Sequence, residues 1–145
     1  MTQDAKSPSV SPIEVSFPLR RALYTTLHIH LTFLATTTMV FLTTTSTGES
    51  KGVTRPMGSF VYAMPNRLHH GDTLATSMYT TPNTIDYARR TAQALARRMN
   101  MPVYVGCSIE LSGQVAEEET AGLAQIINTI LAKWEEVKGK KEAQS

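Results

Sequence analysis

The sequence contains a single cysteine, Cys107, among its 145 residues. An intrachain disulfide is therefore impossible, which is typical of proteins from reducing compartments. No apolar run approaches the roughly 20 residues that a membrane-spanning helix needs, and the N-terminus lacks the apolar stretch of a secretory signal. These absences predict a soluble intracellular protein without a membrane partner. We expect it in the cytoplasm, with the nucleus as an alternative.

Charged residues are scarce, at 18%, and fourteen basic residues nearly balance twelve acidic ones. A general nucleic-acid binder would have a clustered basic face and a higher isoelectric point, so we expect no nucleic-acid partner. The sequence also lacks a Gly-x-Ser-x-Gly elbow, a His-Glu-x-x-His motif, a phosphate loop and a dinucleotide fingerprint. No pair of acid and base groups can be located either, so the motifs of the sequence point to no catalytic residue.

Threonine is abundant, at twenty positions, and β-branched residues favour sheets. Apolar and polar residues alternate cleanly over 24–34, which predicts a strand. A second short alternating segment ends at Pro18, and proline is tolerated in edge strands. We expect the complete set of strands at 13–17, 24–34, 38–45, 59–64, 73–80 and 103–109.

Helical periodicity appears over 82–100 and 117–138, where apolar residues form one stripe. We expect the first helix to have Thr81 as its N-cap and the second to end at Gly139. Strands followed by late helices predict an α+β domain over 13–138, with a mainly antiparallel sheet of about six strands and two amphipathic helices. We expect residues 1–12 to form a disordered tail and 139–145 a C-terminal tail.

Two helices can cover only one face of a sheet of this size. The strands at 38–45 and 59–64 nevertheless carry apolar residues on both faces. A partner protein is the simplest cover for a second apolar face. We expect Val40, Leu42 and Val61 to contact that partner.

Two kinds of side chain have alternative interpretations. His28 and His30 lie two residues apart, so both project from one face of a strand, as in some zinc sites. No third ligand with a defined spacing joins them, and two partly exposed strand histidines are the simpler interpretation, so we expect no metal. Cys107 has apolar neighbours of the same parity and is interpreted as a buried structural thiol.

Four arginines make the first predicted helix basic: Arg89, Arg90, Arg97 and Arg98. One interpretation is a solvated helix face. The other is docking to an acidic protein surface, because arginine makes bidentate contacts with carboxylates. Under the second interpretation the four arginines are candidates for binding a client protein.

The order of these elements resembles the proteasome assembly chaperone 4 family, in a fungal version. The closest stretch runs from Leu95 to Val105, where the family has a helix that ends in a similar Leu-Ala-Arg sequence and passes into a Val-aromatic-Val strand. The resemblance extends to the strand around His28, the apolar strand around Val40, the Tyr62-Ala63-Met64 strand and the helix through Trp134.

The resemblance implies a protein without enzyme activity and without a cofactor. It would pair with a similarly folded chaperone, number 3 of the series. The heterodimer would bind the fifth α-type subunit of the 20S proteasome, promote assembly of the seven-membered α ring and leave before the mature particle forms. Two other hypotheses stay open at this point. One is a generic dimeric α+β interaction module with another client, and the other is a metal-assisted enzyme that uses His28 and His30.

Overall fold

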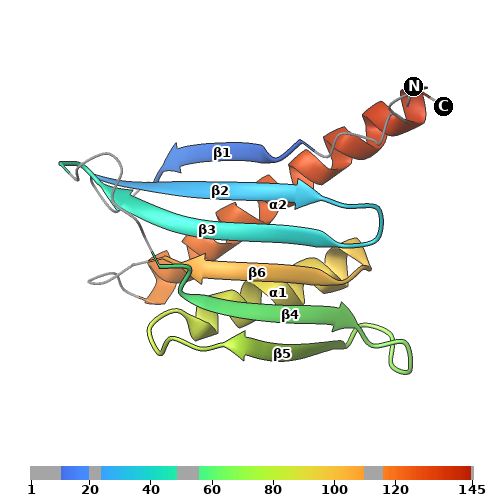
Figure 1. The fold of residues 1–145 in the computed structure, drawn as a ribbon, viewed down its shortest axis with the longest axis horizontal. Helices are drawn as coiled ribbons and strands as arrows, with labels where there is room; N and C mark the ends of the chain where they lie inside the picture. Colours follow the sequence, from blue (N-terminus) through green and yellow to red (C-terminus); the bar gives the residue numbers. More distant parts are fainter. Residues whose placement is uncertain (1–10, 20–23, 49–55, 110–115, 145) are drawn as a thin grey trace, which may run out of the picture.

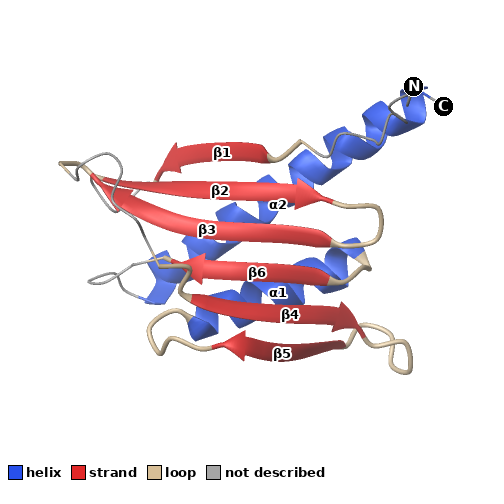
Figure 2. Ribbon diagram, in the orientation of Figure 1, coloured by secondary structure: helices blue, strands red, loops and turns tan. Residues whose placement is uncertain are grey.

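The computed structural model describes residues 11–19, 24–48, 56–109 and 116–144. Within these residues all strands join one sheet, and both helices lie on the same side of it (Figure 1). Figure 2 shows the resulting two layers, a sheet and a pair of helices. The predicted α+β class is confirmed. The elements in chain order are β1 (Ile13–Pro18), β2 (Thr25–Phe33), β3 (Thr38–Ser46), β4 (Ser59–Pro65), β5 (Thr73–Tyr79), α1 (Ile85–Met99), β6 (Val103–Ser108) and α2 (Ala116–Gln144).

The strands are ordered β1-β2-β3-β6-β4-β5 across the sheet. Neighbouring strands run antiparallel, except that β3 and β6 pair in parallel. β6 follows α1 along the chain, and a helical connection of this kind allows a strand to join a parallel neighbour. The mainly antiparallel sheet is confirmed, and β6 lies near its centre between the β2–β3 and β4–β5 hairpins.

The core lies between the sheet and the two helices. In β2, alternate residues point toward the helices, and Leu27, Ile29 and Leu31 are almost completely buried. α1 packs on β4, β6 and β5, whereas α2 packs on α1 and β2. The predicted apolar stripes of both helices are buried in this core: Ala88, Ala92, Leu95 and Met99 from α1, and Leu123, Ile126 and Ile130 from α2.

The start of α1 differs from the sequence-based expectation. The helix begins at Ile85 with Thr84 as its N-cap, rather than with Thr81. The Thr84 hydroxyl makes no capping bond, because it accepts from the Ser59 backbone N–H at 3.2 Å and lies 2.8 Å from the Ser59 hydroxyl. Thr81 in turn donates its backbone N–H to Ser59 Oγ at 2.9 Å. This small polar network ties the first turn of α1 to the start of β4.

The end of α2 also differs, because the helix continues through Gly139 to Gln144. A single glycine costs a helix only about 1 kcal/mol, and contacts along the preceding turns support it. The Lys138 ammonium lies 4.2 Å from the centre of the Trp134 ring, and Lys133 forms an ion pair with Glu136 at 3.3 Å. The C-terminal part of α2 runs past the β1 edge of the sheet (Figure 1).

Two predicted irregular segments fall partly or largely outside the described residues. Residues 1–10 of the expected N-terminal tail lie outside them, and β1 begins at Ile13 as predicted. Residues 49–55, between the predicted strands at 38–45 and 59–64, also lie outside them. The predicted edge position of the first strand is confirmed, because β1 pairs only with β2.

Candidate protein-interaction face

The sheet face opposite the two helices is the candidate functional site, and we call it the open face. Neither helix covers it (Figure 2). Strand register places Tyr104 between Met39 and Tyr62 on this side of the sheet. Large apolar side chains therefore concentrate on its central strands, and all of them are half-buried: Met39, Phe41, Phe60, Tyr62, Met64 and Tyr104. An exposed apolar area of this kind is typical of a surface that binds another protein.

The aromatic rings of the open face form a continuous row across the sheet. The Phe41 and Phe60 ring centroids are 6.2 Å apart with planes inclined by 3°. Phe60 lies 5.7 Å from Tyr104, and Tyr104 lies 4.7 Å from Tyr62. At the other end His30 lies 6.4 Å from Phe41. These separations lie within the range over which aromatic rings interact favourably, so the row is ordered before any partner binds.

Gly106 makes the central part of this row possible. It lies in β6 and pairs with Phe41 on one side and Phe60 on the other. A Cβ atom at Gly106 would lie 2.6 Å from Cδ1 of Phe41 and 3.3 Å from Cγ of Met57. The absence of a side chain therefore lets the two phenylalanine rings approach each other over the middle strand.

The three residues predicted to contact a partner lie on the other face of the sheet. Val40 and Val61 are fully buried and Leu42 is 2% exposed, all within the core formed with the helices. Successive residues of a strand point to opposite faces of the sheet, and in β3 and β4 the residues that point to either face are apolar. We therefore correct the candidate contact residues to those of opposite parity, such as Phe41 and Phe60.

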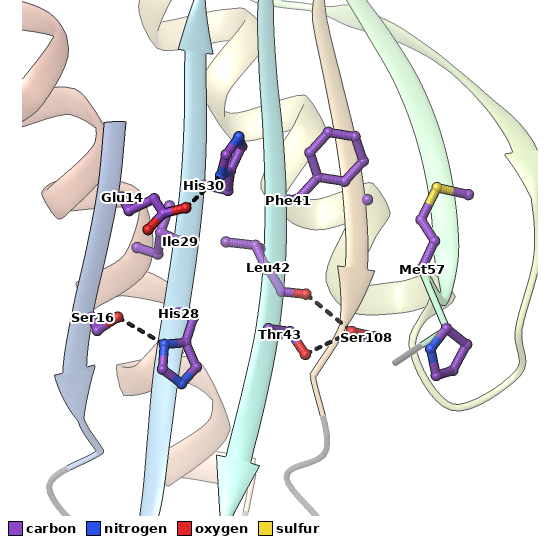
Figure 3. Close-up of a pocket in the computed structure, with 12 residues that line it drawn as sticks. Glu14, Ser16, His28, Ile29, His30, Phe41, Leu42, Thr43, Met57 and Ser108 are labelled. Carbon is purple, nitrogen blue, oxygen red and sulfur yellow. Dashed lines mark hydrogen bonds and ion pairs between the residues drawn. The ribbon is translucent and has the colours of Figure 1, made fainter. Parts of the chain in front are cut away.

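A hollow of about 370 Å³ opens on the part of this face formed by β1, β2, β3 and β6 (Figure 3). Phe41, Gly106 and Met57 provide much of its apolar lining. Its polar lining consists of Glu14, Ser16, His28, His30, Thr43 and Ser108.

The two histidines of the hollow are held by different partners. The His28 ring has both nitrogens occupied, with Nδ1 at 2.7 Å from Ser16 Oγ and Nε2 at 2.8 Å from Thr45 Oγ1. His30 Nδ1 lies 3.4 Å from Glu14 Oε1. Within the described ranges, no group of three or more histidine, cysteine or acidic side chains could hold a metal ion. The predicted common face of His28 and His30 is confirmed, and hydroxyl groups rather than further metal-ligand types surround His28.

Cys107 lies on the helix side of β6 and is fully buried, which confirms the predicted structural thiol. Burial raises the pKa of its thiol to about 11. The reactive thiolate form is therefore strongly disfavoured at neutral pH. Cys107 contributes packing to the core.

The four arginines are exposed on α1, on the side of the sheet away from the open face (Figure 1). Arg89 Nη2 donates to Ser77 Oγ at 3.1 Å, and Arg90 Nη1 donates to Asp86 Oδ2 at 3.4 Å. Arg97 and Arg98 occupy the last turn of α1, where positive charge favours the helix dipole. The aromatic open face and the arginine-rich helix are thus two separate surfaces.

In the described part of the chain, neither helix combines the length and the apolar character needed to cross a bilayer.

Fold and open face together define an α+β domain with one helix-covered sheet face and one aromatic face. The model of the proteasome assembly chaperone 4 family matches residues 26–109. This match spans more than half of the chain and contains β2 to β6, and the chain belongs to that family. The predicted resemblance to this family is confirmed, and its fungal version stays a prediction.

The fold is also similar to that of a solved structure described as the crystal structure of a novel chaperone complex for yeast 20S proteasome assembly. The TM-score is 0.59 at 19% sequence identity, and the alignment covers 87% of this chain and 95% of the other. At this identity the similarity shows the shared fold. The search of curated proteins found no match.

Proposed function

We propose that this chain is a non-catalytic chaperone that pairs through its open face with a related chaperone of the number 3 type. The heterodimer binds the fifth α-type subunit of the 20S proteasome and promotes assembly of the α ring, in the cytoplasm and also in the nucleus. Family membership supports the role in proteasome assembly. The observation that carries the pairing is the ordered aromatic row on a sheet face that no helix covers.

The physical reason for pairing is the apolar area that the open face leaves in contact with water. A second sheet packed at the usual spacing of about 10 Å would bury both faces. Removing apolar surface from water contributes about 25 cal/mol per Å². The rings of Phe41 and Phe60 are already stacked, so little side-chain freedom remains to be lost when a partner binds.

We assign client binding to the opposite side of the molecule. The exposed arginines of α1 form a basic surface there, and arginine binds carboxylates in a fork geometry. Because α1 and the open face lie on different sides of the sheet, a related chaperone and an acidic client surface can bind at the same time. This supports Arg89, Arg90, Arg97 and Arg98 as the client-docking residues.

The mechanism is selective binding rather than chemistry. A chaperone that binds one arrangement of ring subunits more tightly raises the population of that arrangement by its differential affinity. Its affinity must also permit release, and incoming subunits that compete for the same surface would displace it.

The decisive experiment is affinity purification of the tagged full chain from the cells that produce it, followed by mass spectrometry. We expect recovery of a related small chaperone together with a proteasome α-type subunit. A substitution of Phe60 by glutamate serves as the matched control and should lose the chaperone. Recovery of neither protein would refute the proposal, and recovery of a related partner with an unrelated client would favour a general interaction module.

A further inference from the structure

We propose that the hollow on the open face receives a positively charged side chain of the partner, preferably an arginine, whose charge is met by Glu14. This inference rests on the proposed function, since a partner must cover the open face. It goes further by specifying the chemistry of the group that enters.

The hollow combines an apolar wall with a polar rim. Phe41 and Met57 both lie close to Gly106 on its apolar side, where a Cβ atom would be 2.6 Å from Cδ1 of Phe41 and 3.3 Å from Cγ of Met57. Glu14 and His30 lie together at the β1–β2 side. A volume of about 370 Å³ is large enough for a long side chain. An occupant must therefore present an apolar stem and a polar end.

The carboxylate of Glu14 determines which charge the polar end of the occupant should carry. Its side chain is 80% exposed, so water solvates the carboxylate in the free chain, and the nearby His30 Nδ1 is 3.4 Å away. A partner lowered onto the open face removes this water. A carboxylate that loses its water without gaining a charged partner is costly, whereas a cation inserted beside it offsets that cost.

Arginine fits the complete lining better than lysine. Its planar guanidinium stacks on aromatic rings, and Phe41 forms one wall of the hollow. The same group binds a carboxylate with two parallel hydrogen bonds. The hydroxyl oxygens of Ser16 and Thr43 lie in the same lining and offer further acceptors.

A second copy of this chain cannot supply the cation from its sheet. The six strands contain no lysine and no arginine, as their sequences show. Two open faces of this chain would instead bring two Glu14 carboxylates into one apolar interface. The strands of a second copy therefore offer Glu14 no cation, which disfavours self-pairing of two open faces.

The first test uses the free full-length chain and a small probe. N-acetyl-arginine methylamide is titrated while NMR follows the ring signals of His28 and His30 and the methyl signal of Met57. The uncharged isostere N-acetyl-citrulline methylamide is the matched probe. We expect a saturable response to the arginine probe that is at least about threefold weaker for citrulline, as for an exposed ion pair.

Two variants locate that response. Glu14→Gln should abolish the preference for arginine, while Glu135→Gln, an exposed acid on α2, should preserve it. Equal responses to both probes, or an unchanged preference in Glu14→Gln, would overturn the proposal. Circular dichroism and urea unfolding confirm that both variants are folded.

The second test uses the heterodimer with the related chaperone. Glu14→Gln should increase its dissociation rate by roughly 30-fold, because the partner's cation loses its counter-charge in a dehydrated interface. A wild-type dissociation rate in this variant would refute the proposal that the hollow binds a cation of the partner. The proposed function would remain intact. Failure to recover any related chaperone would refute the proposed function. A Glu14-dependent arginine preference of the free chain would still support a cation-binding hollow.

Discussion

Phe41 and Phe60 stack across Gly106, with ring centroids 6.2 Å apart and planes inclined by 3°. The two rings belong to strands that are not neighbours, since β6 lies between β3 and β4. Their contact therefore depends on the one residue of β6 that has no side chain. This arrangement joins the two hairpins into a single aromatic surface.

The first prediction concerns this glycine. Gly106→Ala should displace the Phe41 ring, because the new Cβ would lie 2.6 Å from its Cδ1 atom. We expect a loss of roughly 1 to 3 kcal/mol in the free energy of unfolding, as for other overpacked sites, and weaker pairing. Urea unfolding and the affinity for the related chaperone measure the two effects.

The control for this prediction is Gly122→Ala in α2, where a Cβ atom would meet no atom within 4 Å. Alanine favours a helix interior over glycine by about 1 kcal/mol, so this variant should be more stable than the wild type. An equal response of the two variants would contradict the assigned role of Gly106.

The second prediction separates the two faces of one strand. Phe60→Glu places a charge on the open face and should leave the free chain folded while reducing pairing by several kcal/mol. Val61→Glu places the same charge in the core beneath the helices, where Val61 is fully buried, and should prevent folding. Far-ultraviolet circular dichroism and a pairing assay distinguish the outcomes. Undiminished pairing by Phe60→Glu would exclude the open face as the interface.

Most of the fold could be predicted from sequence periodicity, but the orientation of the central strands could not. Polar histidines and threonines mark the open side of β2, so its buried residues follow from alternation alone. In β3 both Val40 and Phe41 are apolar, and nothing local indicates which of them faces the helices. The choice depends on β6, which enters the sheet in parallel after α1 and pairs Val40 with Val105. The hollow was equally beyond prediction, since Glu14 and Met57 come to line the same space only in the folded sheet.

The third prediction concerns Cys107. Its thiol is buried and burial raises its pKa to about 11, so both access and ionisation oppose reaction with a thiol reagent at pH 8. We expect Ellman's reagent to label the native chain only through transient opening, and the urea-unfolded chain rapidly. The ratio of the two rates should follow the free energy of unfolding across variants. Rapid labelling of the folded chain would contradict this placement.

The fourth prediction concerns Tyr87 and Glu119, which connect α1 to α2. Burial and a hydrogen bond to Glu119 raise the pKa of the Tyr87 phenol to about 12. The native state then holds the phenolic proton more tightly than the unfolded state, whose pKa is near 10. The resulting stability is complete below pH 10 and is lost as the pH rises toward 12.

The variant Tyr87→Phe tests this link. It should cost about 1 kcal/mol near neutral pH through the lost hydrogen bond, and the difference from the wild type should shrink between pH 10 and 12. Urea midpoints at each pH measure the difference in stability between Tyr87→Phe and the wild type. Alkaline effects common to both chains cancel in this difference. Tyr79→Phe, at an exposed tyrosine, controls for removal of a hydroxyl. A difference that stays constant with pH would show that Tyr87 does not contribute in this way.

The fifth prediction concerns the basic end of α1. Arg97 and Arg98 are exposed in its last turn, so the double variant Arg97→Glu/Arg98→Glu should leave pairing unchanged and weaken binding of the α-type subunit. We expect a loss of about tenfold at low salt, since charge complementarity governs such contacts, that diminishes toward 0.5 M salt as screening increases. Lys140→Glu, an exposed lysine on the far part of α2, is the control for a change in overall charge. A loss that does not depend on salt, or that Lys140→Glu reproduces in proportion to its charge, would assign the client to another surface.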